Sequence, residues 1–260
     1  MSPTQGQLKI AAIQHDIIWQ DRDANLSAYA PQVGEAAADG ARLIVLSEMF
    51  ATGFSMETDV VAEAPDGPSV TFLIDQAAAH DAWLCATVPV RDPDRPLPVN
   101  RLILAGPGGE LHHYDKIHPF SYGGEDQHYS PGTCFLTVDI DGLAVSPFVC
   151  YDLRFADEFW GLADTTDVYL VPANWPAKRR AHWRALLVAR AIENQAYVVG
   201  VNRIGEGGGL DYSGDSLIIS PLGDVLADGG ESNEETLTAL LEADVVTQTR
   251  DHFPFLQDRR

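Results

Sequence analysis

Short apolar runs rich in β-branched residues recur along the chain, and they limit its possible folds more than any other feature. Seven such runs occur, at residues 8–14, 42–48, 83–90, 101–106, 143–150, 167–174 and 197–203. Each is bounded by Gly, Pro, Asp or Asn, which is typical of buried strands. The sequence therefore predicts a fold built on many strands with two covered faces.

Helical periodicity fills part of the sequence between these runs. Residues 65–82 carry apolar side chains at helical spacing, with Pro68 suited to the first turn. The apolar positions of this segment are Val70, Leu73, Ile74 and Ala77. A similar stripe runs through residues 181–195, and a third helix is expected over residues 26–38, with Asn25 as its N-cap.

Two segments read as β-hairpins rather than as strand–helix units. Residues 101–116 surround a Gly-Pro-Gly-Gly turn, and residues 216–228 repeat the pattern near the C-terminus. Helices that alternate with strands, together with hairpins, predict a layered α/β fold with a mixed sheet. No linker or low-complexity tract divides the chain, so residues 1–260 are expected to form one domain.

The charge balance limits the partners of the protein. The formal net charge is −21, with 38 acidic residues against 17 Lys and Arg. Such a field repels nucleic acid and anionic membranes. Two readings of the acidic surface remain open, a solubilising surface or a cation-binding role.

Cysteine usage and the N-terminal sequence favour a cytoplasmic protein. Cys85, Cys134 and Cys150 are an odd number without a CxxC pair, which argues against a disulfide framework and a structural zinc site. Residues 1–14 lack the basic and apolar regions of a signal peptide. No apolar run approaches the ~20 residues that span a bilayer, so no membrane association is expected.

Three of the predicted strands lead into a reactive side chain. These side chains are Glu48, Lys116 and Cys150. In α/β folds, catalytic groups gather where strands end, because the sheet fixes their positions. A thiolate can attack a carbonyl, a carboxylate can transfer protons, and an ammonium can stabilise an oxyanion. Taken singly, each residue also fits a structural role, as a solvated strand end, a surface ion pair or a buried apolar side chain.

Several segments in order resemble the nitrilase superfamily of carbon–nitrogen hydrolases. The matching segments are LSEMFATGF around Glu48, YDKIHPFSYGGEDQHYSPG around Lys116, CYDLRF at Cys150, PANWPAKRRAHWRALLVARAIENQAYVVGVNRIG, and YSGDSLIISPLGDVLA. The resemblance covers essentially the whole chain. It implies a four-layer αββα sandwich with two mixed β-sheets, a Glu48–Lys116–Cys150 triad, and assembly into a homodimer or a higher homo-oligomer. It also aligns Glu125 with a second glutamate that orients the triad.

The turn after Cys150 carries further expectations. We expect Cys150 to terminate a buried strand with its sulfur in the pocket, and the Tyr151 N–H to face the oxyanion. Asp152 and Arg154 are expected to brace the turn as a buried ion pair, because a buried charge needs a partner. His118 is expected near the pocket.

Within the superfamily, the segments from ANWPAKRRAHW onward and the terminal FPFLQD resemble the omega-amidase branch. That resemblance implies hydrolysis of the terminal amide of a small dicarboxylate monoamide such as 2-oxoglutaramate, with no cofactor and no metal. The expected pocket residues are Phe54, Tyr122, Asn174 and Trp175, and Trp175 also fits a core or dimer contact. The cluster Lys178, Arg179 and Arg180 fits either attraction of an anionic substrate or a solvated helical turn.

Three alternatives stay open at this point. An N-carbamoyl amino acid amidohydrolase would use the same triad and release carbon dioxide as well as ammonia. A non-catalytic scaffold could keep the fold without the reaction, although every triad position holds a competent residue. A metal protein would need the four histidines of residues 112–128, but His112 and His113 are adjacent on a strand and point to opposite faces.

Overall fold

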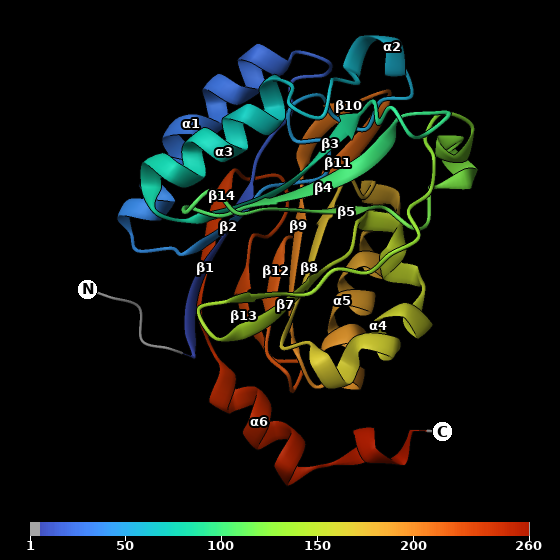
Figure 1. The fold of residues 1–260 in the computed structure, drawn as a ribbon. Helices are drawn as coiled ribbons and strands as arrows, with labels where there is room; N and C mark the ends of the chain where they lie inside the picture. The colour runs from blue at the N-terminus through green and yellow to red at the C-terminus, as the bar shows by residue number, and fades with distance from the viewer. Residues whose placement is uncertain (1–5, 260) are drawn as a thin grey trace.

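Two six-stranded mixed sheets form the centre of the molecule (Figure 1). The structure is a computed structural model and describes residues 6–259. The first sheet has the strand order β14-β1-β2-β3-β4-β5. Its strands are β1 (Gln7–Gln14), β2 (Leu43–Val45), β3 (Trp83–Val90), β4 (Val99–Ala105), β5 (Leu111–Asp115) and β14 (Glu235–Glu242).

The second sheet has the order β13-β12-β9-β8-β7-β6. Its strands are β6 (Val138–Ile140), β7 (Leu143–Pro147), β8 (Val168–Ala173), β9 (Tyr197–Asn202), β12 (Leu217–Ile219) and β13 (Val225–Asp228). A separate two-stranded ribbon consists of β10 (Ile204–Gly207) and β11 (Leu210–Ser213). Each of the seven apolar runs overlaps one of these strands.

Both sheets combine a parallel centre with antiparallel hairpins. Strands β1, β2 and β3 are parallel, as are β7, β8 and β9. The two predicted hairpins are confirmed as the antiparallel pairs β4–β5 and β12–β13. In the first hairpin Arg101 lies opposite Asp115. This register also makes Asn100 and Lys116 neighbours across the two strands.

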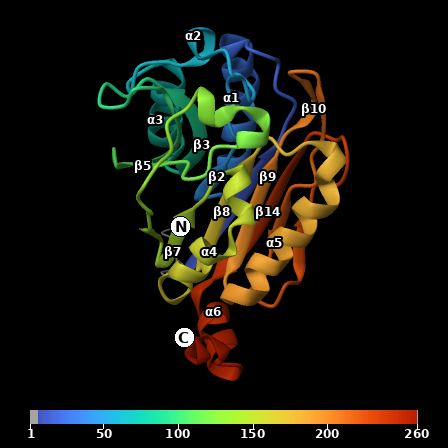
Figure 2. The same cartoon turned by 90° about the vertical axis from the view of Figure 1, so that its right-hand side faces the viewer.

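Helices cover the outer face of each sheet. The helices are α1 (Arg22–Ala38), α2 (Thr58–Val61), α3 (Pro68–His80), α4 (Ala156–Leu162), α5 (Arg180–Asn194) and α6 (Ala243–His252). Helices α1 and α3 lie on the first sheet, and α4 and α5 lie on the second (Figure 2). The order helix, sheet, sheet, helix confirms the expected αββα sandwich.

The helix predictions were right in position and partly wrong in detail. Helix α3 begins at Pro68, as expected, and buries Val70, Leu73 and Ala77. The cap of α1 was wrong: the Asp21 carboxylate accepts from the Ala24 N–H at 3.1 Å. Asn25 lies inside the helix and is fully buried. Its side chain does not cap the helix but donates to the backbone carbonyls of Ile18 and Ala51.

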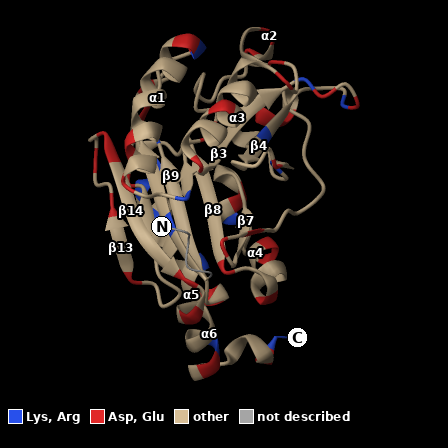
Figure 3. Ribbon diagram, turned by 60° about the vertical axis from the view of Figure 1, so that its left-hand side comes forward, with Lys and Arg blue, Asp and Glu red and all other residues tan. Residues whose placement is uncertain are grey.

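Acidic positions are spread over the helices and connecting loops, with few basic positions between them (Figure 3). The net charge of −21 therefore belongs mainly to the outer layers. Among residues 6–259, no helix has both the length and the apolar character that crossing a membrane requires.

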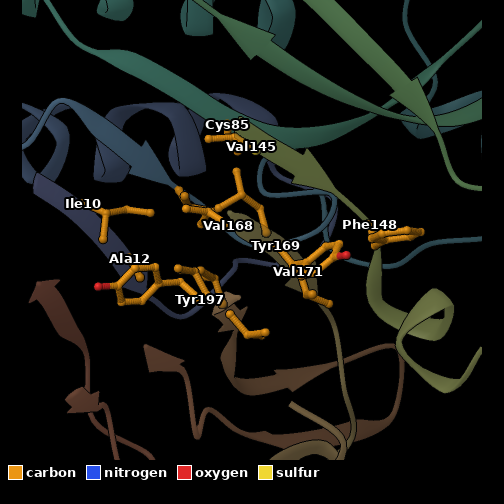
Figure 4. Packing of buried hydrophobic residues seen from close by; sticks show 14 of the residues in the cluster. Ile10, Ala12, Cys85, Val145, Phe148, Val168, Tyr169, Val171 and Tyr197 are labelled. Atoms are coloured by element: carbon orange, nitrogen blue, oxygen red, sulfur yellow. The ribbon is translucent and has the colours of Figure 1, made fainter. Parts of the chain in front are cut away.

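The main core lies between the two sheets (Figure 4). Successive residues of a strand point to opposite faces, and β1 shows this directly. Ile10 and Ala12 face the second sheet, whereas Ala11 and Ile13 pack in the smaller core beneath α1 and α3. Because both faces of the central strands are covered, the loops at their ends are held rigidly.

Candidate active site

Four reactive side chains meet where strands of both sheets give way to loops. Glu48 follows β2 by three residues, and Lys116 directly follows β5. Glu125 begins a short 3-10 turn, and Cys150 begins another, over Cys150–Arg154. All four residues are buried. The structure thus brings together the residues that the sequence predicted as a triad with a second glutamate.

Lys116 connects the two glutamates. Its Nζ donates to Glu48 Oε1 at 2.9 Å and to Glu125 Oε2 at 2.8 Å. Burial lowers the pKa of Lys116, but the two carboxylates outweigh burial and hold that pKa well above its usual value. The ammonium therefore stays charged and is available as a fixed positive group.

The glutamates find further donors in the loops around them. The Asn174 N–H donates to Glu48 Oε2 at 2.8 Å, and the Asn174 side chain donates to the Glu48 carbonyl. The Phe120 N–H donates to Glu125 Oε2. Burial raises the pKa of Glu125, and Glu48 adds to the rise while Lys116 opposes it. Two carboxylates around one ammonium leave an excess negative charge beside the sulfur.

The side chain of Asn100 lies between the same two glutamates. Its Nδ2 donates to Glu48 Oε1 at 2.9 Å and to Glu125 Oε1 at 3.0 Å. The residue is buried in β4. Sequence reasoning missed it, although the register of the β4–β5 hairpin places residue 100 opposite residue 116.

Cys150 has a backbone conformation that few non-glycine residues adopt. Its φ is +46°, in the left-handed region, which costs of order 1–3 kcal/mol and is concentrated at functional sites. Burial raises the pKa of the Cys150 thiol well above its usual value, Glu48 adds to the rise, and Lys116 opposes it. The resting sulfur is therefore a neutral thiol, and its attack on a carbonyl needs a base.

The turn after Cys150 differs from the expectation in two ways. Strand β7 ends at Pro147, so Cys150 lies beyond the strand and not at its last position. The expected Asp152–Arg154 ion pair was wrong. The buried Asp152 carboxylate instead accepts from the Tyr114 hydroxyl at 2.8 Å and from the His118 N–H at 2.9 Å. Hydrogen bonds thus satisfy the buried carboxylate without an arginine.

A pocket opens over Cys150. Its lining residues are Phe54, Phe120, Cys150, Tyr151, Arg154, Asn174, Trp175, Pro176, Arg179, Leu210 and Tyr212. Three of the four expected pocket residues are in this lining. Tyr122 is not: its side chain is 86% exposed beside Phe120. Within residues 6–259 the Tyr151 N–H has no backbone or side-chain acceptor, so it is free to donate to a bound group.

Two arginines face this pocket. The Arg154 guanidinium lies over the Trp175 ring at 4.7 Å, and the Arg179 guanidinium lies over the Phe120 ring at 5.4 Å. Most other arginines of the described chain pair with a carboxylate, but neither of these two does within residues 6–259. Of the basic cluster at the start of α5, Arg180 pairs with Asp215, and Lys178 is exposed outside the pocket lining.

Sequence reasoning missed the position of Arg154, which it assigned to Asp152. Tyr212 and Leu210 were also missed, since they come from the β10–β11 ribbon, far away in sequence. Asn202, at the end of β9, fixes the Trp175 backbone: its Oδ1 accepts from the Trp175 N–H at 2.7 Å.

The histidines do not gather into a metal site in the described part of the chain. Among residues 6–259, no three His, Cys, Asp or Glu side chains are grouped so that they could hold a metal ion. His112 stacks on Trp83 with ring centroids 6.0 Å apart, and His118 Nδ1 lies 3.0 Å from Asp152 Oδ1.

Comparisons with known proteins agree with this geometry. The family model of carbon–nitrogen hydrolases matches residues 9–251. Omega-amidase YafV of Escherichia coli K12 is 40% identical over 252 residues, which cover 96% of each chain. The 2-oxoglutaramate amidase of Bacillus subtilis is 31% identical over 257 residues, covering 96% of this chain and 97% of that protein.

A solved structure shows the same fold. XC1258 from Xanthomonas campestris, a CN-hydrolase superfamily protein with an arsenic adduct in its active site, is 36% identical and superposes with a TM-score of 0.92. The alignment covers 98% of this chain and 97% of XC1258. The fold, the buried glutamate–lysine pair beside a cysteine and the extent of these matches agree: this chain belongs to the carbon–nitrogen hydrolase family.

Proposed function

We propose that this carbon–nitrogen hydrolase is an omega-amidase. It hydrolyses the terminal amide of a small dicarboxylate monoamide, 2-oxoglutaramate or a close analogue, to the dicarboxylate and ammonia. One observation carries the proposal: the pocket that contains Cys150 also contains two arginines without carboxylate partners in the described chain. The thiol suits the amide end of such a substrate, and the arginines suit its carboxylate end.

Acylation begins when the Cys150 sulfur attacks the amide carbon and its proton passes to Glu48. Glu48 is suited to this transfer because the thiol is neutral at rest and the carboxylate charge acts directly on it. The oxyanion that develops is stabilised by the Lys116 ammonium and the Tyr151 N–H. Collapse of the tetrahedral intermediate breaks the C–N bond, and Glu48 returns the proton so that ammonia leaves and a thioester remains.

Deacylation uses the same groups in reverse order. Glu48 takes a proton from water as the oxygen attacks the thioester carbon, and that proton returns to the sulfur when the C–S bond breaks. The sum is amide plus water giving carboxylic acid plus ammonia. Glu125 holds the other side of Lys116 and fixes the direction of the ammonium, which explains a second buried carboxylate at the site.

The substrate class follows from charge. A guanidinium binds a carboxylate through two parallel hydrogen bonds, and such charge-assisted bonds are stronger than neutral ones. On a protein with a net charge of −21, a pocket with two guanidiniums that have no carboxylate partner in the described chain is a local exception that selects an anionic substrate. The names of two relatives, omega-amidase and 2-oxoglutaramate amidase, support the same class.

The test is ammonia release by the purified protein from 2-oxoglutaramate, N-carbamoyl amino acids, glutamine and a simple nitrile. Cys150→Ala serves as the blank, with circular dichroism to show that it is folded. Cys150-dependent release that is fastest from 2-oxoglutaramate supports the proposal. Release only from a carbamoyl compound would keep the triad and replace the substrate. Full activity of Cys150→Ala would refute the mechanism.

We also propose a single-domain, cytoplasmic homodimer. The two sheets share one core cluster, which supports a single domain. Cys85, Cys134 and Cys150 are all free thiols, which suits a reducing compartment. Ile192 on α5 and Leu222 beside it are 48% and 67% exposed, an apolar surface suited to a second copy. Light scattering after gel filtration would test the dimer, and a monomer at micromolar concentration would refute it.

A further inference from the structure

We propose that Asn100 is a positioning residue of the active site: its side-chain amide holds the two glutamates in the geometry that proton transfer to and from Cys150 requires. The inference rests on the roles proposed above for Glu48, Lys116 and Glu125. It adds to the site a buried amide that is not among the lining residues of the pocket.

Asn100 contacts every other polar member of the glutamate–lysine cluster. Its Nδ2 donates to Glu48 Oε1 at 2.9 Å and to Glu125 Oε1 at 3.0 Å, and its backbone carbonyl accepts from the Lys116 N–H at 3.0 Å. Lys116 Nζ closes the ring, with 2.9 Å to Glu48 and 2.8 Å to Glu125. Four residues from separate segments thus form one closed set of hydrogen bonds.

A side-chain amide suits this position because it offers two hydrogen-bond donors and carries no charge. An NH₂ group carries two hydrogens, so it can serve two carboxylates at once. A second ammonium would cancel the excess negative charge beside the sulfur, whereas a carboxylate would repel both neighbours. Asn100 therefore supplies two donors without adding charge.

The other end of the amide shows that these two bonds decide its orientation. Asn100 Oδ1 is buried and has no hydrogen-bond partner among the described residues. A buried acceptor without a partner is costly. The reverse orientation would place Oδ1 against both carboxylates, so the two bonds from Nδ2 to Glu48 and Glu125 fix which way the amide faces.

Loss of these donors changes the proton affinity of the carboxylates in a known direction. Hydrogen bonds to an ionised carboxylate favour the ionised form. Without Asn100, the pKa of Glu125, which burial already raises, rises further, and the cluster loses one of its two carboxylate charges at a higher pH. Four other titratable groups act on the two carboxylates: Lys116 and Cys150, and two tyrosines that burial keeps neutral, Tyr129 and Tyr212.

The experiment compares Asn100→Ala with Asn194→Ala. Asn194 is a matched control, because it is also fully buried, donates through Nδ2, here to the Arg190 carbonyl at 2.8 Å, and has an unpartnered Oδ1. It lies at the end of α5, outside the pocket lining. Both variants are followed from pH 5 to pH 9 by two readouts, kcat/KM for 2-oxoglutaramate and the rate at which iodoacetamide alkylates Cys150. A Cys134→Ser background removes the exposed thiol from the second readout.

We expect the acidic limb of both profiles to move up by about one pH unit in Asn100→Ala, since hydrogen bonds to charged groups are of that magnitude. On that limb kcat falls by up to about tenfold while KM stays within about threefold. Asn194→Ala keeps the wild-type midpoint even if its melting temperature falls. An unchanged midpoint in Asn100→Ala, or a loss that is uniform across pH, would overturn the proposal.

A second variant covers a failure of Asn100→Ala to fold. Asn100→Asp keeps the volume and replaces the donor by a third carboxyl, so its midpoint should move in the same direction and further; an unchanged midpoint again overturns the proposal. The alkylation readout needs no substrate. If the wild-type protein releases no ammonia, the proposed function fails, whereas the alkylation profiles still decide the role of Asn100.

Discussion

The two arginines of the pocket make a quantitative prediction about substrate recognition. Replacing Arg154 or Arg179 with Met keeps most of the apolar stem against the Trp175 or Phe120 ring and removes the guanidinium. A hydrogen bond to a charged group is worth about 1.5–3 kcal/mol. For the arginine that binds the substrate carboxylate, kcat/KM for 2-oxoglutaramate should therefore fall about ten- to 150-fold.

The assay separates charge recognition from damage to the pocket. Ammonia release is measured with 2-oxoglutaramate and with a neutral amide of similar length, for which the same variant should stay within about threefold of wild type. Lys178→Met is the matched control. It removes one positive charge from the next position along the chain, but Lys178 is exposed and outside the pocket lining. Only a weak, salt-screened effect is expected from it.

Two results would refute the reasoning. If both arginine variants lose the neutral amide as strongly as the anionic one, the arginines shape the pocket rather than bind the carboxylate. If Lys178→Met loses as much activity on 2-oxoglutaramate as the two pocket variants, the preference comes from the overall field near α5 and not from direct contact. In either case the proposed anionic substrate class would lose its structural support.

Two further predictions concern stability. Burial alone raises the pKa of Asp215, but Arg180, Ser213 and Arg184 outweigh burial and hold that pKa below its usual value of 3.8. The ionised Asp215 therefore stabilises the fold above pH 3.8, and this stabilisation is lost as the pH falls through the lowered pKa. Asp215→Asn should therefore lower the melting temperature at pH 7 and much less at pH 3; an equal loss at both would contradict this account. Phe148→Ala removes a fully buried ring stacked on Phe159 at a centroid distance of 3.9 Å, and urea unfolding should show a loss of about 3–5 kcal/mol, whereas a loss below about 1 kcal/mol would show that the core collapses around the gap.

The layers of the fold could be predicted from the sequence because burial patterns are local. Each of the seven apolar runs overlaps a strand, since a strand covered on both faces needs a continuous apolar run. Strand β14 was not predicted, because it lies at the edge of its sheet and only Leu237 and Leu241 are buried. Its partner β1 lies more than two hundred residues earlier, a pairing that no local pattern records.

The chemistry of the site was predicted better than its supports. Glu48, Lys116 and Cys150 stand out because reactive side chains that follow apolar runs can be read along the chain. The partners of Asp152 could not be read in this way, since Tyr114 lies in β5 of the other sheet and His118 lies in the loop that follows β5. Tyr122 was also wrongly expected in the pocket: it lies on an exposed turn, with Ser121 and Gly123 exposed on either side of it.

The hydrogen bonds between Glu48 and Asn174 have a consequence for the folding of the enzyme. The two residues are 126 positions apart and follow strands of different sheets, β2 and β8. Contacts between such distant segments form late, because long loops must close before the contact repays the lost chain entropy. In a chain with one sheet formed and the other still unfolded, the glutamate is solvated and the thiol is flexible. Such a chain does not hydrolyse an amide. During refolding, the return of amidase activity should therefore coincide with the docking of the two sheets.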